Sequence, residues 1–308
     1  MPFRFLYRPS GMRPVIVIPS YRGAFRLQRL LESVLLYDPA AYSSANWIVV
    51  EDPSDERSTA DFRKVLSGYP TIFRKLPEWS NMHGAAKAAF EFAAEVYDPE
   101  WVIYLGDDIL VTPNALSSMI TFLTLNKLET IGLVQFPYWN AHELCQADNH
   151  SDRQGPGLLR TKEDMYTQDP SWLLDVPRNP HWEGEGYARP YINVNGVGFA
   201  ARLSNYFAVG GFASGTWCLD ESIAVRTWLN GPLGVVCLPG PCLVHYFGAA
   251  SLSGTPAHDL HTEERWTVAM GMSKSESARL MYEQLEARKA AILTETRAAQ
   301  YFQVRTFA

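Results

Sequence analysis

The sequence predicts an α/β protein whose central, mostly parallel sheet is flanked by helices. Three observations lead to this prediction. The first third of the 308-residue chain alternates short apolar runs with segments of helical spacing, polar residues directly follow the apolar runs, and residues 273–302 are rich in Ala, Glu, Arg and Leu. A strand–helix alternation of this kind predicts parallel strands joined by right-handed crossovers, with helices on both faces.

The elements follow in order along the chain. The short apolar runs predict strands over residues 14–19, 46–50, 71–76 and 101–105. Apolar residues at helical spacing predict the intervening helices over residues 27–36, 60–66 and 83–96. After the fourth strand we expect Thr112 to be the N-cap of the next helix and Pro113 its first residue.

The second half is less regular. A strand is expected at residues 131–136, whereas residues 137–190 are polar, Trp-bearing and broken by Pro and Gly. Loops of this length inside a compact domain are usually lids or binding loops. Regular structure is expected again over residues 191–201, 203–209, 234–238 and 242–246, with a helix opening at Asp220 and one or two helices in residues 273–302.

Composition narrows the possible functions. The chain is 47% hydrophobic and 19% charged, with a net charge of −6 and a pI of about 5.7. It therefore lacks the bulk positive field that recruits nucleic acid or anionic membranes. The four cysteines form no CxxC pair, no apolar run is long enough to span a bilayer, and the N-terminus has no signal-peptide core. We expect a soluble, reduced, cytoplasmic protein.

Adjacent acids follow two of the predicted strands. Asp107 and Asp108 come directly after residues 101–105, and Glu51 and Asp52 come after the second strand. Open α/β sheets bind ligands at the carboxyl ends of their strands. Neighbouring carboxylates there are costly unless a cation lies between them, which favours a divalent metal at Asp107 and Asp108. The alternative is a turn whose acids are only solvated.

Five segments in this order resemble GT-A glycosyltransferases, the group that includes the large family 2. Residues 15–22 look like the opening strand of that fold and its exit. Residues 49–55 are similar to the hydrophobic-Asp-Asp-Gly-Ser element, with Pro53 in place of Gly, and residues 81–90 look like the Gly-Ala-rich helix entry. Residues 105–109 resemble the metal-binding DxD element, and are closer still to the Glu-Asp-Asp form of the N-acetylglucosaminyltransferases that begin complex N-glycan branching. Asp220-Glu221, followed by Arg226, is similar to the Glu-Asp…Arg element.

The resemblance implies a role for each matching residue. The implied donor-binding residues are Pro19, Ser20, Tyr21, Arg22, Glu51, Asp52, Lys87, Asp107 and Gly196. Asp108 is the expected direct ligand of Mn²⁺ or Mg²⁺ and His245 a second one; a His beside oxygen ligands favours Mn²⁺. Gly106 stands where the usual element has its first acid, so the metal would depend mainly on Asp108.

A general base is expected at the start of the helix after residue 219. Asp220 and Glu221 both fit, because a helix N-terminus keeps a carboxylate ionised, and the sequence leaves the choice open. Trp139, Trp172 and Trp182 are candidate acceptor-stacking residues. Each residue also has a purely structural alternative: a helix cap for the acids, a core histidine for His245, a strand bend for Gly196 and hydrophobic anchors for the tryptophans.

These features together predict a metal-dependent, inverting hexosyltransferase that moves a sugar from a nucleotide-sugar donor, with a UDP-sugar favoured, to a hydroxyl acceptor. The acceptor stays open between a saccharide, a lipid-linked sugar, a protein and a modified nucleobase, and the oligomeric state is unknown. The alternatives are a nucleotidyltransferase and a non-catalytic, sugar- or polymer-binding descendant. We expect residues 1–136 to bind the nucleotide sugar, residues 137–255 to bind the acceptor and carry catalysis, and residues 256–308 to form a helical extension.

Overall fold

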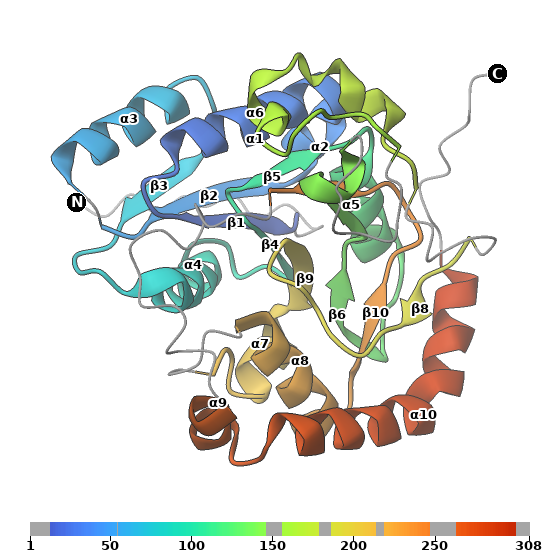
Figure 1. The fold of residues 1–308 in the computed structure, drawn as a ribbon. Helices are drawn as coiled ribbons and strands as arrows, with labels where there is room; N and C mark the ends of the chain where they lie inside the picture. The colour runs from blue at the N-terminus through green and yellow to red at the C-terminus, as the bar shows by residue number, and fades with distance from the viewer. Residues whose placement is uncertain are drawn as a thin grey trace.

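The computed structural model describes residues 13–53, 55–145, 156–178, 186–213, 219–246 and 263–299. In this part of the chain a large sheet has the strand order β3-β2-β1-β4-β9-β6-β10-β8 (Figure 1). Its strands are β1 (Val15–Ser20), β2 (Asn46–Glu51), β3 (Ile72–Lys75), β4 (Trp101–Leu105), β6 (Ile131–Gln135), β8 (Arg189–Pro190), β9 (Gly198–Arg202) and β10 (Gly234–Cys237).

The predicted parallel sheet is confirmed. β1 pairs in parallel with β2 and β4, and β2 pairs in parallel with β3. β1 and β4 are buried along their whole length, as strands covered on both faces must be. β9 runs antiparallel between β4 and β6, so this strand from the second half of the chain completes the same sheet.

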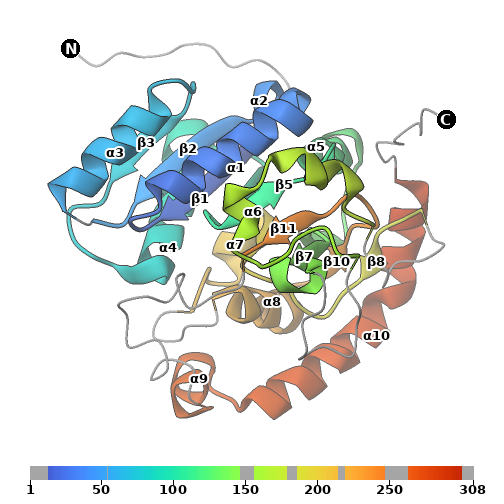
Figure 2. The ribbon, with the colours of Figure 1, turned by 45° about the horizontal axis from the view of Figure 1, so that its top comes forward.

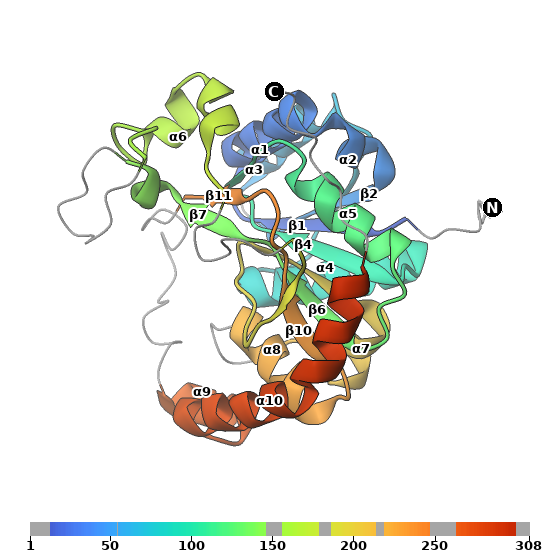
Figure 3. The ribbon, with the colours of Figure 1, turned by 90° about the vertical axis from the view of Figure 1, so that its right-hand side faces the viewer.

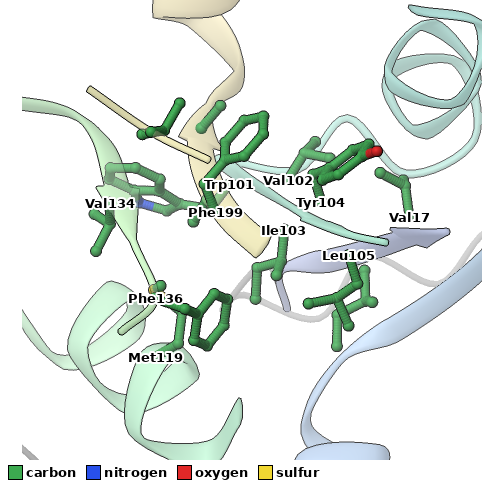
Figure 4. Packing of buried hydrophobic residues seen from close by; sticks show 14 of the residues in the cluster. Val17, Trp101, Val102, Ile103, Tyr104, Leu105, Met119, Val134, Phe136 and Phe199 are labelled. Carbon is green, nitrogen blue, oxygen red and sulfur yellow. The ribbon is translucent and has the colours of Figure 1, made fainter. Parts of the chain in front are cut away.

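Helices cover both faces of the large sheet. α1 (Ala24–Tyr37), α3 (Glu56–Leu66) and α5 (Ala115–Leu125) lie on one side in Figure 1, and α4 (Asn81–Tyr97), α7 (Leu203–Ala208) and α8 (Leu219–Asn230) lie on the other. The core lies between these layers. Figure 4 shows Ile103 and Leu105 of β4 on the side of Met119 and Phe136, whereas Tyr104 points to the opposite side and stacks on Phe199 at 5.2 Å.

A small second sheet lies beside the large one, in the order β5-β11-β7 (Figure 2). Its strands are β5 (Ile109–Val111), β7 (Tyr138–Asn140) and β11 (Leu243–His245). It has its own apolar cluster, which includes Leu110, Leu144, Met165, Trp172, Leu173 and Val244. Much of the region expected to be irregular is therefore folded, with η1 (Ala141–Leu144), α6 (Asp164–Thr167) and η2 (Pro170–Asp175) packed around this cluster.

The expected start of the helix at Thr112 and Pro113 is wrong. α5 begins at Ala115 after Asn114, and Thr112 Oγ1 instead donates to the carbonyl of Cys242 at 2.6 Å. The N–H of Ser117, in the first turn of α5, donates to Asp38 Oδ2 at 2.8 Å. A carboxylate that is remote in sequence therefore caps the helix. Asp38 immediately precedes α2 (Pro39–Ser44), a short helix that the sequence pattern does not reveal.

The helix expected in residues 273–302 is confirmed as α10 (Lys274–Ala298), and a shorter helix, α9 (Glu263–Met270), precedes it. α10 runs past α8 and β8 (Figure 3) and buries Ile292 completely. Glu295 Oε2 accepts from the N–H of Thr130 at 2.9 Å, which ties the end of α10 to the segment before β6. Among the described helices, none is long and apolar enough to cross a membrane.

Candidate functional site

Asp108 and His245, the two predicted metal ligands, lie side by side. β11 pairs antiparallel with β5 so that His245 faces Ile109, and the N–H of Tyr246 donates to the carbonyl of Asp108 at 2.9 Å. This pairing places His245 Nε2 3.4 Å from Asp108 Oδ2, with side chains that are 17% and 12% exposed. Among the residues that the structure describes, no third His, Cys, Asp or Glu completes a metal-binding group with them.

His245 has a second partner on its other ring nitrogen. Nδ1 lies 3.1 Å from Oδ1 of Asn140, the last residue of β7. Asn140 and His245 face each other in the parallel pairing of β7 with β11. The imidazole is therefore held between Asn140 and Asp108.

Asp107 turns away from this pair. Arg26 Nε donates to Asp107 Oδ1 at 3.3 Å, Arg26 Nη2 donates to Oδ2 at 3.1 Å, and Ser20 Oγ also donates to Oδ2. The carboxylate lies against the start of α1, where a Cβ added to Gly23 would come within 1.9 Å of Oδ2. Asp107 and Ser20, two of the predicted donor-binding residues, thus contact each other, and Asp107 also contacts Arg26. Their role in donor binding stays a prediction.

The other residues at the end of β1 lie nearer the surface. Arg22 has a φ of 50°, its guanidinium lies over the Tyr21 ring at 5.3 Å, and Nη2 is 3.6 Å from Asp55 Oδ2. The carbonyl of Tyr21 accepts from Arg26 Nη2 at 3.4 Å. Pro19, in contrast, is buried inside β1.

Glu51 and Asp52 are both buried, so neither is the solvated acid of the structural alternative. Glu51 Oε1 accepts from Thr59 Oγ1 in α3 at 2.9 Å. Asp52 Oδ1 accepts from the N–H of Ser80 at 2.8 Å and from its hydroxyl at 3.0 Å, just before α4 begins. These carboxylates connect the starts of α3 and α4 to the end of β2. The expectation that Glu51 and Asp52 bind the donor stays a prediction.

Gly196 connects the metal-ligand pair to Asp220. Its N–H donates to Asp220 Oδ2 at 2.7 Å, while its carbonyl oxygen would lie 3.3 Å from a Cβ added to Gly106. The same Cβ would come within 2.9 Å of Asp108 Oδ1. Gly106 is thus the residue type that this close approach requires, and Asp108, Gly196 and Asp220 line one continuous edge.

Asp220 and Glu221, the acidic pair at the start of α8, have different partners. Asp220 faces Gly196, whereas Lys274 Nζ of α10 donates to Glu221 Oε2 at 3.4 Å, with both of those side chains about 40% exposed. Burial raises the pKa of Asp220, and the N–H groups of Gly196 and Glu221 oppose that rise by stabilising the anion.

Comparison with known proteins shows what the chain is similar to. The model of Glycosyl transferase family 2 matches residues 15–162. The mannosyltransferase PcManGT from Pyrobaculum calidifontis, solved with GDP-Man and Mn²⁺, is 16% identical with a TM-score of 0.52, over 93% of this chain and 76% of that one. TarS from S. aureus, solved with UDP-GlcNAc, is 12% identical with a TM-score of 0.56, over 92% of this chain and 74% of that one.

The chain has the GT-A fold, and its residues 15–162 are similar to glycosyl transferase family 2. GalNAc-T7, solved with UDP, GalNAc and Mn²⁺, is also similar, at 13% identity and a TM-score of 0.57 over 94% of this chain and 59% of that one. At these identities the likeness to solved structures shows the fold. No curated protein sequence matches the chain significantly.

Two further residues of the family resemblance have contacts within the protein. Lys87 is exposed on α4 and pairs with Glu91 at 3.8 Å. Arg226 Nη1 donates to the carbonyls of Gly210 and Gly211 at 2.7 and 2.9 Å, so it closes the end of α7.

The candidate acceptor-stacking tryptophans also have other surroundings. Trp172 is 5% exposed inside the cluster of the small sheet, as its alternative role of a hydrophobic anchor requires. Trp139 is partly buried, and its Nε1 donates to the carbonyl of Pro177 at 2.8 Å. Trp182 lies outside the described residues.

Three residues that the sequence does not single out contact the predicted site residues. Arg26 holds Asp107, Asn140 contacts His245, and Ser80 is bound by Asp52. The position of Arg26, a positively charged residue early in α1, is only a weak sequence signal of its contact with Asp107. Asn140 and Ser80 carry no local signal, because their partners are remote in sequence.

Proposed function

We propose that this protein transfers a sugar, with inversion, from a nucleotide-sugar donor to a hydroxyl group of an acceptor. One observation carries the proposal: the pair of Asp108 and His245 follows the carboxyl end of β4, and Gly196, which approaches the neighbouring Gly106, binds Asp220 through its N–H. A transfer site needs a charge-neutralising side for the leaving diphosphate and a proton-accepting side for the incoming hydroxyl. The family 2 match supports the same activity.

Asp108 and His245 are the residues that would hold a divalent cation. A carboxylate oxygen and an imidazole nitrogen 3.4 Å apart form a donor set that suits Mn²⁺. When bound, the cation would neutralise the charge that develops on the departing nucleoside diphosphate. Two protein ligands leave room for phosphate oxygens and water. The GT-A structures solved with Mn²⁺ support a divalent ion.

Asp220 is our choice for the general base, rather than Glu221. Its carboxylate is fixed by the Gly196 N–H and faces the edge that carries Asp108, whereas Glu221 points to Lys274. In the transfer step the acceptor oxygen forms a bond to the anomeric carbon while Asp220 takes its proton. The bond from that carbon to the phosphate oxygen breaks, and its electron pair leaves with the nucleoside diphosphate.

The donor is proposed to be a UDP-hexose, with its base near Tyr21, Arg22 and Asp52 at the ends of β1 and β2. Of the similar structures, one was solved with UDP-GlcNAc and another with GDP-Man. A GDP-sugar is therefore the donor to compare with a UDP-sugar. A cytoplasmic location is proposed from the spacing of the four cysteines in the sequence, which form no CxxC pair.

The test is incubation of the protein with a panel of nucleotide sugars or nucleoside triphosphates plus Mn²⁺. Release of a nucleoside diphosphate from one nucleotide sugar, abolished in Asp220→Asn and retained in Glu221→Gln, supports the proposal. Pyrophosphate release from a triphosphate supports a nucleotidyltransferase instead. Binding of a nucleotide sugar without turnover supports a non-catalytic descendant.

A further inference from the structure

The turn that leads into β9 brings Gly196 to Asp220. The N–H of Gly198 donates to the carbonyl of Asn195 at 3.2 Å, and the N–H of Val197 donates to Asn195 Oδ1 at 3.0 Å. Asn195 therefore closes the turn with its backbone and with its side chain, as Asn commonly does in turns. The N–H of Gly196 takes no part in this closure and donates to Asp220 Oδ2 at 2.7 Å.

Gln135, the last residue of β6, holds the turn at residues 195–198 from inside the protein. It is 1% exposed, and its Nε2 donates to the carbonyl of Gly198 at 3.0 Å and to that of Phe136 at 2.8 Å. Its Oε1 accepts from the N–H of Asn195. The partners fix which end of the amide is the nitrogen, because carbonyls only accept and an N–H only donates. One side chain thus binds the first and the last residue of the turn.

Gln135 is the polar exception in its strand. The other residues of β6 are Ile, Gly, Leu and Val, and all five are buried. A buried amide is costly unless it is hydrogen-bonded, and a fully bonded one favours a single local geometry. Here that geometry is the position of Gly196. The N–H of Gly106 also donates to the carbonyl of Val197 at 3.1 Å, so the same turn is attached to the end of β4.

We propose that Gln135 is a positioning residue for Asp220, because it holds the turn at residues 195–198 so that the Gly196 N–H stays on the carboxylate. The inference rests on the proposed role of Asp220 as the general base. A general base must be ionised and must lie within reach of the hydroxyl whose proton it takes. The Gly196 N–H serves both needs, since it fixes the position of Oδ2 and stabilises the anion.

The titratable groups that act on Asp220 come from three elements: Glu221 from α8 itself, Tyr104 from β4 and Tyr138 from β7. Burial raises the pKa of Asp220, the charge of Glu221 adds to that rise, and the Gly196 N–H opposes it. Burial also raises the pKa of Tyr104, and that of Tyr138 to about 12, so both phenols stay neutral around neutral pH. Loss of the Gly196 hydrogen bond should therefore move the protonation of Asp220 to higher pH.

The first test is a pH titration of the Gly196 amide by ¹H–¹⁵N NMR. In the wild type the amide proton should shift as Asp220 ionises, and in Asp220→Asn this shift should be absent. Gln135→Met has a side chain of similar length that makes none of the three hydrogen bonds, and its midpoint should move to higher pH. Ser117→Ala is the control for lost stability: it removes a buried hydroxyl bound to Asp38 at the start of α5, on the opposite face of the sheet from α8, and should keep the wild-type midpoint (Figure 1).

The second test is the pH dependence of nucleoside diphosphate release from the donor that the panel identifies. Misplacement of a catalytic group by about 1 Å can cost about 10²-fold in rate, and we expect Gln135→Met to lower kcat by about 10–100-fold. KM for the donor should not change, because Asp220 acts on the hydroxyl. The acid limb of the kcat profile should move to higher pH together with the NMR midpoint, and Ser117→Ala should keep the wild-type kcat and profile.

Gln135→Met with the wild-type midpoint and kcat overturns the proposal. Fast exchange of the Gln135 side-chain amide protons in the wild type overturns it even if Gln135→Met fails to fold, because a donor to two buried carbonyls should exchange slowly. Full activity of Asp220→Asn, with the Gly196 titration as expected, is a distinct result. It removes Asp220 as the proposed general base, and the positioning role of Gln135 in catalysis with it.

Discussion

Replacing Arg26 should destabilise the protein strongly, because Arg26 is the counterion of Asp107 at the entrance to α1. The two side chains are 23% and 12% exposed and share contacts at 3.1 and 3.3 Å. Removing one partner of a buried ion pair costs about 3–5 kcal/mol. Ser20 Oγ and the N-terminus of α1 still stabilise the Asp107 anion, and a well-placed helix end contributes up to about 2 kcal/mol.

The expected loss for Arg26→Met is therefore about 2–4 kcal/mol in the free energy of unfolding. Urea unfolding followed by circular dichroism measures it. Arg279→Met is the control for the same substitution in an exposed pair. Its i,i+4 partner is Glu283, both side chains are more than half exposed, and the expected loss is about 0.3–0.5 kcal/mol.

A double variant separates the ion pair from the packing of the Arg26 side chain. Arg26→Met combined with Asp107→Asn should be less destabilised than the sum of the two single variants, because no charge is left without a counterion. Additive effects, or a loss under about 1 kcal/mol for Arg26→Met alone, would refute the assignment of Asp107 to this internal pair.

Three further predictions concern the candidate site and the small sheet. Asp220→Asn should lower kcat about 10²–10⁴-fold with donor affinity unchanged; steady-state kinetics and calorimetry check both, and full activity would place the base elsewhere. Gly106→Ala should weaken Mn²⁺ binding and cost about 1–3 kcal/mol of stability, since its Cβ meets Asp108 Oδ1 at 2.9 Å. Gly68→Ala, with no atom within 4 Å of its Cβ, is the control, and equal behaviour of the two variants counts against the close approach. Trp172→Ala should cost about 3–5 kcal/mol in urea unfolding because the ring is 5% exposed in the second cluster, and a loss below about 1 kcal/mol would contradict that burial.

The large sheet could be predicted because its strands carry strong local signals. β4 has the bounds expected from the sequence, since five consecutive apolar residues followed by two acids leave little choice for a strand buried on both faces. The short strands of the small sheet are harder to see. β5 and β7 have three residues each, too few to show a period, whereas β11 lies inside the strand expected over residues 242–246.

Candidate site residues could be predicted only where the residue type itself indicates a chemical role, such as metal binding. Asp108 and His245 were expected as a pair from the family resemblance, and the structure brings them together. Other contacts join remote parts of the chain: Arg26 pairs with Asp107, Ser80 donates to Asp52 and Ser117 donates to Asp38. Such partners follow from the packing of helices on the sheet, which a local pattern does not encode.

The most direct test of the proposed function is calorimetric titration of the protein with UDP, and with GDP for comparison, in Mn²⁺ and in EDTA. The account predicts that one nucleoside diphosphate binds only with Mn²⁺, that Asp108→Asn loses this binding and that Asp220→Asn keeps it. Equal binding in EDTA, or unchanged binding by Asp108→Asn, would contradict a metal-assisted donor site at Asp108 and His245.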